Sequence, residues 1–269
     1  MSTPDVDINL LRRQIEAVDS ELAQLIAKRL QLADAIGTAK NAQASPSNPL
    51  RMGREAAIIK RILREESAEA DPPAFTAIWR AIMGRNVVRQ GLGPIYIASG
   101  VDLLKCHDHA RLYFGSEADL RVVEDGRTAL TLVLDAPMAV AVLSWPGAGG
   151  AGQWWPVLGE TRFAPLAILG AWPLRQSPQD GRGVAIVGRG VLEPSDPTTD
   201  CSILIGIDHQ HRAGDLLSQA GFKPIEILRA RAMMLAKIEG YVSADDPRLR
   251  NLAASAGEHL RLAGVYASA

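Results

Sequence analysis

Cationic side chains occupy positions where the helical pattern of the N-terminal third predicts apolar residues. Arg29 stands between Leu25 and Leu32, and Lys40 follows Ile36 on the same stripe. Eleven residues separate the two cations, close to three helical turns, so they share one face about 16 Å apart. Side chains of this length can converge on one small anion lying between them.

More polar residues of this kind lie on the next two predicted helices. Asn86 and Gln90 are four residues apart and extend the apolar line of the third helix, and Arg54 and Glu55 open the second. Burying such groups is costly unless they are paired or bind something. Internal salt bridges or solvated helix ends are therefore the alternative interpretation. No acidic residue lies on the stripe near the two cations of the first helix, so the set as a whole predicts an anionic ligand in a helix bundle.

Three helices must position these side chains. The first is expected from about Ile8 to the breaker at 45–49, and at about 50 Å it is too long for two short helices to cover. A second copy of the chain would supply the missing surface. The second helix is expected over about 53–67, and the third starts at the cap and first-turn pair Asp71-Pro72. The apolar stripe of the third helix is Phe75, Ile78, Trp79, Ile82 and Met83.

Five short segments of residues 8–91 carry a family resemblance. They are LRRQIEAVD at 11–19, AKR at 27–29, IGTAK at 36–40, GREA at 53–56 and NVVRQ at 86–90. In this order and with these loop lengths, they resemble the all-helical class of chorismate mutase. The resemblance implies the Claisen rearrangement of chorismate to prephenate in aromatic amino-acid biosynthesis. That pericyclic reaction needs no acid, base, metal or cofactor, only a held conformer and charge stabilisation at the breaking ether oxygen.

The resemblance also implies a role for each residue. Arg29 would clamp one carboxylate of chorismate, Lys40 and Gln90 would donate to the ether oxygen, and Glu55 would accept from the ring hydroxyl. Arg12 would aid Arg29 from the partner subunit. It lies 28 residues before Lys40, roughly 40 Å along one helix, so it can serve the site only from an antiparallel second chain of a homodimer.

Three further residues belong to the implied substrate site. Arg54 and Asn86 would complete the carboxylate site, although Asn86 stands where a serine is common in relatives. Arg51 stands near the hydroxyl site, where many relatives have an acidic residue. Both departures are expected to tune affinity for chorismate.

Charge and composition exclude several classes of protein. The chain has 269 residues, a net charge of −1 and 47% hydrophobic residues, which argues against a general nucleic-acid binder and against disorder. Two cysteines fit a reducing compartment. No secretory signal or membrane span is visible, so we expect a cytoplasmic protein.

The chain changes character at Gly91-Leu92-Gly93-Pro94, where short β-branched runs separated by Gly and Pro begin. We expect a fold of the α + α/β class. A three-helix intertwined-dimer domain at 1–92 would precede a small single-lobe α/β domain at 93–199 and a βαββαβ domain at 200–269. The expected strands are 95–98, 120–124, 138–144, 166–169, 184–187, 202–207, 225–229, 233–241 and 260–266.

The C-terminal two-thirds faintly resemble a reduced prephenate dehydratase followed by an ACT domain. Thr161-Arg162-Phe163 is similar to a dehydratase motif, and 245–248 and 262–266 are similar to the ACT tail. An ACT domain implies an aromatic amino acid as a candidate effector. However, residues 143–147 differ from another motif of the dehydratases. Only about 105 residues precede the ACT-like part, which is enough for one lobe of a two-lobed enzyme. We therefore expect the dehydratase activity to be lost and the module to be accessory or regulatory.

Two alternatives stay open at this point. The chain is a bifunctional mutase–dehydratase with an unusual minimal second site, or it is a non-catalytic chorismate-binding partner of another shikimate-pathway enzyme. The cluster at 106–109 is expected to be a solvated helix face rather than a metal site. Asp208 and His211 are expected to form a turn.

Overall fold

The structure, a computed structural model, describes residues 7–41, 48–65, 71–98, 102–148, 153–174, 183–256 and 260–267. By its internal contacts the chain divides into two compact units, Met1–Pro46 and Ser47–Ala269.

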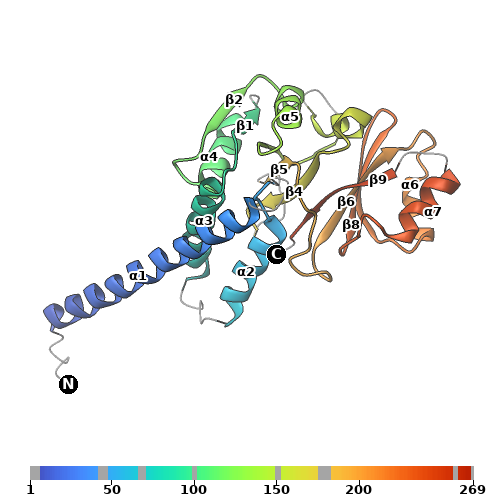
Figure 1. Ribbon diagram of the computed structural model, residues 1–269. Helices are drawn as coiled ribbons and strands as arrows, with labels where there is room; N and C mark the ends of the chain where they lie inside the picture. Colours follow the sequence, from blue (N-terminus) through green and yellow to red (C-terminus); the bar gives the residue numbers. More distant parts are fainter. Residues whose placement is uncertain are drawn as a thin grey trace. The chain divides into compact units, whose positions relative to one another are not determined.

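A single helix, α1 (Ile8–Asn41), makes up the described part of the first unit after Asp7 (Figure 1). The carboxylate of Asp7 accepts the backbone N–H of Asn9 at 2.9 Å and so caps the start of the helix. With 34 residues the helix is about 50 Å long, as the sequence predicts. Its apolar stripe is exposed, with Ile15 at 60% and Leu25 at 63%. A stripe of this kind needs a partner surface.

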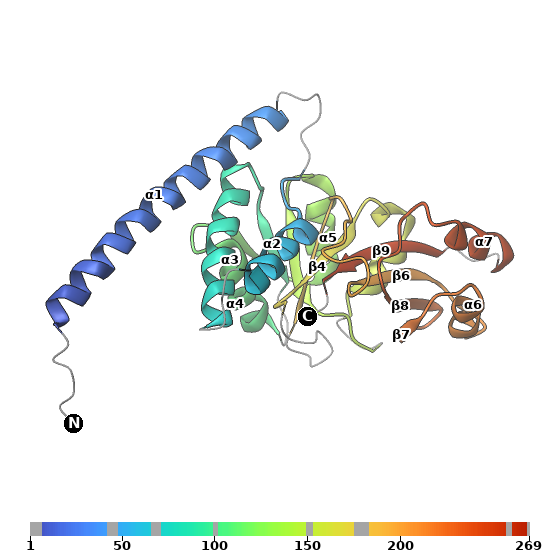
Figure 2. The ribbon, with the colours of Figure 1, turned by 90° about the horizontal axis from the view of Figure 1, so that it is seen from below.

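The described part of the second unit holds one nine-stranded sheet of order β2-β1-β3-β5-β4-β9-β6-β8-β7 (Figures 1 and 2). Its strands are β1 (Ile95–Ala98), β2 (Leu120–Val123), β3 (Val140–Ser144), β4 (Ala167–Trp172), β5 (Val184–Gly188), β6 (Cys201–Ile207), β7 (Pro224–Ala230), β8 (Met233–Glu239) and β9 (Leu260–Tyr266). The helices are α2 (Met52–Glu65), α3 (Pro72–Arg89), α4 (Leu103–Phe114), α5 (Gly126–Asp135), α6 (Ala213–Gln219) and α7 (Pro247–Ala256), with short 3-10 helices η1 (Trp155–Gly159) and η2 (Thr161–Phe163).

Both faces of the sheet are buried by alternating apolar residues. Along β3, Val140 and Val142 belong to the core that α4 covers, whereas Ala141 and Leu143 belong to the core that α5 covers. A period of two residues places successive side chains on opposite faces. Because helices cover both faces, these strands read as continuous apolar runs in the sequence.

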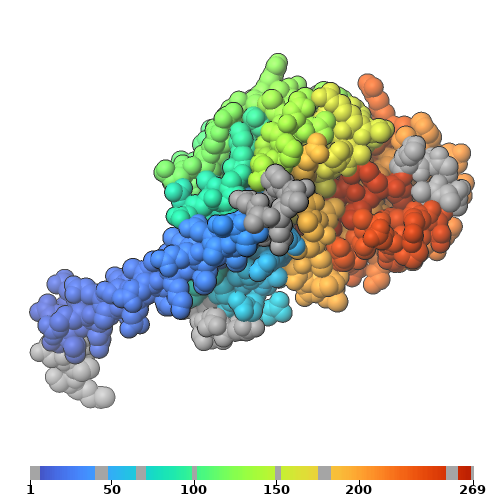
Figure 3. All heavy atoms as spheres, viewed as in Figure 1, coloured from blue at the N-terminus to red at the C-terminus, as the bar shows by residue number. Residues whose placement is uncertain are grey.

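The C-terminal elements follow the predicted βαββαβ order, from β6 to β9, with α6 and α7 on their own apolar core. They join the rest of the sheet through β4 and β9, where Ile168 pairs with Gly264. A Cβ atom at Gly264 would lie 2.7 Å from the Cβ of Ile168, so the close approach of the two strands requires glycine. Figure 3 shows the yellow and orange-red residues as one continuous body. Helices, an α/β lobe and a βαββαβ module in sequence confirm the predicted fold class, while the intertwined dimer stays a prediction.

Helix α3 begins as the sequence predicts but buries a different face. Asp71 caps it, with Oδ1 accepting the N–H of Ala74 at 3.1 Å. The predicted stripe is wrong in part, because Ile78 is 51% exposed. The buried residues are Arg80, Met83, Gly84, Asn86 and Val87. The packing of α3 on α4 selects this face.

Gly84 permits that packing. A Cβ atom there would lie 2.5 Å from the backbone oxygen of Tyr113 and 3.0 Å from the backbone carbon of Phe114. These are backbone atoms of α4, so they cannot rotate away, and the two helices can meet at this distance only at glycine.

Helices α2 and α3 are part of the compact second unit. α2 contacts β4 and β9, and Lys60 Nζ lies 3.4 Å from Asp200 Oδ1. Asp200 is 1% exposed and also accepts the Oγ–H of Ser195 at 2.7 Å, so α2 is tied to the loop before β6. The domain limits 1–92, 93–199 and 200–269 stay predictions.

We expect Gly84→Ala to lower the free energy of unfolding by about 1–3 kcal/mol, because the added methyl group forces α3 away from α4. The exposed Arg85 of the same helix gives the control: Arg85→Ala should stay within about 0.5 kcal/mol of wild type. Urea denaturation of both variants measures the difference. Equal stabilities would contradict the close contact between the helices.

Candidate functional site

The predicted site residues fall in two groups, one in each compact unit. Arg12, Arg29 and Lys40 lie on α1. The other five lie in the second unit, at the start of α2 or at the end of α3; they are Arg51, Arg54, Glu55, Asn86 and Gln90.

The helix α1 fixes the spacing of its three cations along one axis. It runs without a break from Arg12 to Lys40, a rise of roughly 40 Å. Arg12 is exposed; the side chain of Lys40 lies outside the described residues. Since one ligand of chorismate size cannot reach both ends of such a span, these two cations of one chain cannot serve the same ligand.

Glu55 lies in a buried cluster built by three helices. Its Oε2 atom accepts the O–H of Tyr113 of α4 at 2.9 Å and lies 2.6 Å from Nη2 of Arg80 of α3. Arg80 also donates from Nε to the backbone oxygen of Tyr113 at 3.2 Å, and its guanidinium carbon lies 3.9 Å from the centre of the Tyr113 ring. Arg80, Tyr113 and Glu55 are 1%, 2% and 7% exposed.

Electrostatics favour a charged arginine and a neutral tyrosine in this cluster. Burial alone would lower the pKa of Arg80, but Tyr113 and Glu55 overcome that effect and the pKa is raised. Burial raises the pKa of Tyr113 well above its usual value, because the phenolate is poorly solvated there. Tyr113 therefore remains a hydrogen-bond donor to Glu55, and the cluster fixes the direction of the carboxylate.

Arg51 forms an ion pair with a residue of the α/β part of the second unit. Its Nε donates to Oε1 of Glu193 at 2.8 Å, and its Nη2 contacts Oε2 of the same carboxylate. Hydrogen bonding to Glu193 raises the pKa of Arg51 against the opposing effect of burial. The backbone N–H of Arg54 lies 3.4 Å from Oε1 of Glu193, and the Arg54 residue is exposed.

Asn86 carries an unsatisfied polar atom. It is 7% exposed, and its Oδ1 has no hydrogen-bond partner in the part of the chain that the structure describes. A buried amide oxygen without a partner is costly, and a ligand that donates a hydrogen bond would relieve that cost. Gln90, one turn further, is the C-cap residue of α3, and its backbone N–H donates to the backbone oxygen of Asn86 at 3.0 Å.

The sequence interpretation missed Arg80 and Tyr113. Arg80 lies four residues before Gly84 and seven before Val87, on the face that is buried. A glycine inside an otherwise regular helix was the available signal, since it marks a close approach of another backbone. Nothing in the local sequence of Tyr113 distinguishes it from other tyrosines.

The remaining candidates have structural roles. The expectation of a solvated helix face at 106–109 is wrong for Cys106, which is 2% exposed and packs in the core. Burial raises the pKa of its thiol to about 11, which makes it a poor metal ligand. The described residues hold no group of three or more His, Cys, Asp or Glu that could bind a metal ion. Asp208 forms the predicted turn, because its Oδ1 accepts the N–H of Arg212 at 2.8 Å. Phe163 of the dehydratase-like motif is a core residue, whereas Thr161 and Arg162 are exposed.

Over the described ranges, every helix is too short or too polar to cross a membrane.

Comparison with known proteins finds a family match for the N-terminal third. Residues 11–91 match the family model for chorismate mutase type II, which covers the segments that carry the residue pattern and less than a third of the chain. No curated protein sequence matches the chain.

Solved structures resemble the chain only distantly. One is GqqA, described as a novel type of quorum quenching acylase, with 17% identity and a TM-score of 0.43 over 65% of this chain and 95% of that one. Another is a prephenate dehydratase from Streptococcus mutans, with 12% identity and a TM-score of 0.44 over 65% and 98% of the two chains. A third is a prephenate dehydratase from Arthrobacter aurescens in complex with L-Phe, with 11% identity and a TM-score of 0.45 over 65% and 90%. Likenesses this weak assign no activity to the C-terminal region.

Breaking the Glu55 cluster should destabilise the second unit. Arg80→Ala leaves Glu55 buried without its cation and is expected to cost about 3–5 kcal/mol, whereas Tyr113→Phe removes one donor and should cost about 1–3 kcal/mol. The double variant should lose less than the sum of the two, because both side chains act on the same carboxylate. Chemical denaturation of the four proteins measures this coupling. Strictly additive losses would contradict a shared cluster.

Proposed function

We propose, on the premise that residues 11–91 are a chorismate mutase type II domain, that the protein converts chorismate to prephenate. The observation that carries the proposal is the family match, which spans three helices whose candidate residues are cations, amides and the carboxylate of Glu55. The protein would accordingly be an isomerase of aromatic amino-acid biosynthesis.

The chemistry of the reaction fits this set of side chains. Chorismate is a dicarboxylate, and its Claisen rearrangement proceeds without a nucleophile or a proton transfer. An enzyme can accelerate it by holding the folded conformer and by placing fixed donors at the ether oxygen, where negative charge develops. Cations and amide donors supply both effects, and no cofactor is required.

The proposed catalytic residues are Arg29, Lys40, Gln90 and Glu55. Arg29 holds one carboxylate of the substrate, with Arg12 of the second subunit beside it. Lys40 and Gln90 donate to the ether oxygen and stabilise the charge that forms there in the transition state. These are the residues whose removal should affect turnover most.

The other proposed residues bind the substrate, and they are Arg12, Arg54, Asn86 and Arg51. Arg54 and Asn86 complete the carboxylate site, where the side-chain NH₂ of Asn86 would donate to the substrate carboxylate. Glu55 accepts the ring hydroxyl. Tyr113 and Arg80 both contact its Oε2, and a carboxylate has further acceptor positions for a ligand. Arg51, which is held by its ion pair with Glu193, tunes the affinity for the substrate.

We propose that two copies of the chain associate through α1. The exposed apolar stripe of α1 supports this assembly, and so does the separation of Arg12 from Lys40 along one helix. In an antiparallel arrangement, Arg12 of each chain would lie at the site of the other. The region from 93 onward would be an accessory or regulatory module, for which an aromatic amino acid is the candidate effector.

Loss of either donor to the ether oxygen should slow turnover. Lys40→Ala and Gln90→Ala are each expected to reduce kcat by about 10²- to 10³-fold, because one preorganised donor of this kind contributes about 3–4 kcal/mol. Lys28→Ala and Gln24→Ala, on exposed positions of α1, are the matched controls and should keep wild-type rates. Purified protein is incubated with chorismate, and prephenate and phenylpyruvate are resolved by chromatography.

The products of that assay separate the candidate functions. Prephenate alone supports a mutase with an accessory module. Phenylpyruvate, lost in Thr161→Ala or Arg162→Ala, would establish the bifunctional alternative. Binding of chorismate without turnover would replace the mutase proposal with a non-catalytic role.

The shared site predicts complementation between inactive chains. Arg12→Ala and Lys40→Ala should each be inactive alone, but a mixed dimer contains one site with both residues intact. Unfolding and refolding the two variants together should therefore recover up to about a quarter of wild-type activity, since half of the dimers are mixed and each has one intact site. Refolding each variant alone is the control. A mixture no more active than its parts would contradict the intertwined dimer.

A further inference from the structure

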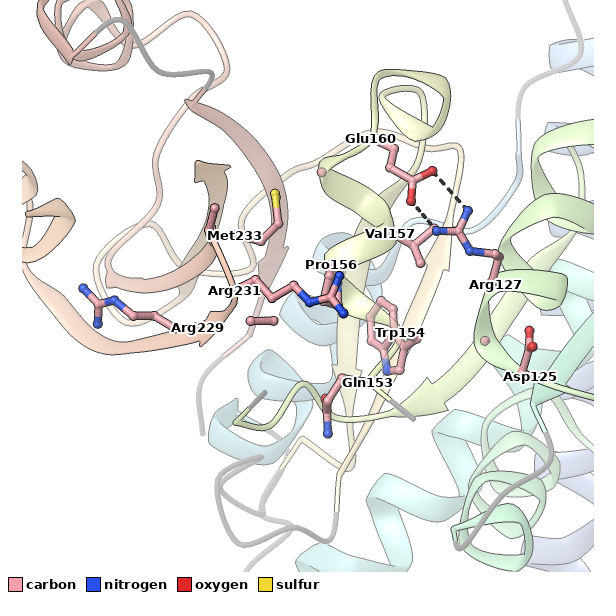
Figure 4. Close-up of a pocket in the computed structure, with 14 residues that line it drawn as sticks. Asp125, Arg127, Gln153, Trp154, Pro156, Val157, Glu160, Arg229, Arg231 and Met233 are labelled. Carbon is pink, nitrogen blue, oxygen red and sulfur yellow. Dashed lines mark hydrogen bonds and ion pairs between the residues drawn. The ribbon is translucent and has the colours of Figure 1, made fainter. Parts of the chain in front are cut away.

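A cavity of about 990 Å³ in the second unit has none of the proposed mutase residues in its lining (Figure 4). The start of α5 and the helix η1 form one wall, and the turn between β7 and β8 forms the other. Its volume is at the upper end of the range of about 300–1,000 Å³ that small-molecule sites occupy. The cavity therefore has room for a ligand and joins the α/β lobe to the βαββαβ module.

Arg231 projects into this cavity from a turn that favours glycine. Ala230 pairs with Met233, so Arg231 and Ala232 are the two loop residues of the hairpin. Arg231 has a φ of 55°, a left-handed conformation that such turns usually assign to Gly, Asn or Asp. An arginine there is strained by about 1–2 kcal/mol, and retained strain is a pointer to function.

The guanidinium of Arg231 has no hydrogen bond or ion pair with any residue that the structure describes. It extends toward Pro156 and Trp154 across the cavity (Figure 4). The other two arginines of the lining are paired. Arg127 forms a bidentate ion pair with the carboxylate of Glu160. Nη2 of Arg229 lies 3.1 Å from Oδ2 of Asp208.

Neither acidic residue of the cavity lining is a counterion of Arg231. Glu160 is held by its pair with Arg127, and Asp125 accepts the backbone N–H of Thr128 at 2.7 Å as the cap of α5. Hydrogen bonding to Thr128 lowers the pKa of Asp125, as expected for a carboxylate committed to a helix start. One cation, Arg231, is therefore available to a ligand.

An apolar wall faces that cation. Trp154 is 4% exposed, and its indole N–H donates to the backbone oxygen of Ser144 at 2.7 Å, so the ring is fixed in place. Val157 and Met233 extend the apolar surface. A rigid aromatic plane beside a free guanidinium suits a ligand with a flat apolar body and one anionic group.

We propose that this cavity binds a small organic carboxylate with a flat apolar body, with Arg231 holding the carboxylate and Trp154 and Val157 contacting the body. The fork of a guanidinium matches the two oxygens of a carboxylate. The site is independent of the mutase proposal, because it shares no residue with it.

Binding of 2-naphthoate, followed by isothermal titration calorimetry on the full chain, tests the site. The neutral isostere 2-naphthamide is the ligand control, since it keeps the ring and removes the charge. We expect naphthoate to bind at least about tenfold more tightly than naphthamide, and Arg231→Gly to reduce naphthoate affinity by at least about tenfold. Arg231→Lys keeps the charge but not the fork and should give an intermediate affinity. Arg111→Ala, an exposed arginine of α4 outside the cavity, should bind as wild type does.

The variant Arg231→Gly also tests whether a fold defect causes the loss. Because glycine adopts a positive φ without strain, the melting temperature of the Arg231→Gly variant should equal or exceed that of wild type, while its affinity for naphthoate falls. Equal binding of acid and amide, unchanged binding in Arg231→Gly, or no binding of naphthoate at millimolar concentration would each overturn the proposal. A lowered melting temperature in Arg231→Gly would overturn the strain argument that singles out this residue.

Discussion

The ion pair between Glu55 and Arg80 is the interaction on which the arrangement of the N-terminal helices within the second unit depends. It lies where α2, α3 and α4 meet, and both of its residues are buried. A buried carboxylate is tolerated only with a cation and further hydrogen bonds; Arg80 supplies the cation and Tyr113 donates the hydrogen bond. The geometry of the pair requires α3 to lie directly on the backbone of α4, which in turn requires Gly84.

This constraint links the two parts of the sequence. Glu55 comes from the segment that matches chorismate mutase type II, whereas Tyr113 comes from the α/β region that follows it. A side chain proposed to bind substrate is thus oriented by a residue from outside the matched domain. The ion pairs Arg51–Glu193 and Lys60–Asp200 make further connections of the same kind. The α/β region is therefore a physical support for α2 and α3, whatever ligand it binds itself.

The residues proposed for the mutase site occur in both compact units. Arg12, Arg29 and Lys40 belong to α1, while Glu55, Asn86 and Gln90 belong to the second unit. The exposed apolar stripe on α1 is a surface that association would cover, and the unpaired Oδ1 of Asn86 is an acceptor that a donating ligand group would satisfy. The cavity at Arg231 also has groups without partners, because the guanidinium of Arg231 and the apolar lining contact no counterion or ligand within the described chain.

The local pattern of the sequence determined the elements and the chemical character of the N-terminal site. Heptad-like spacing predicted α1, the Asp71-Pro72 pair predicted the start of α3, and alternating apolar runs predicted the strands, because each of these signals depends on residues near in sequence. The tertiary structure determined which faces of those elements are buried and which side chains they contact. The buried face of α3, the Glu55–Arg80–Tyr113 cluster and the Arg231 cavity depend on contacts between residues 25 to about 100 positions apart. A local sequence pattern cannot predict such distant partners, because burial of a charged group becomes favourable only once its partner is in place.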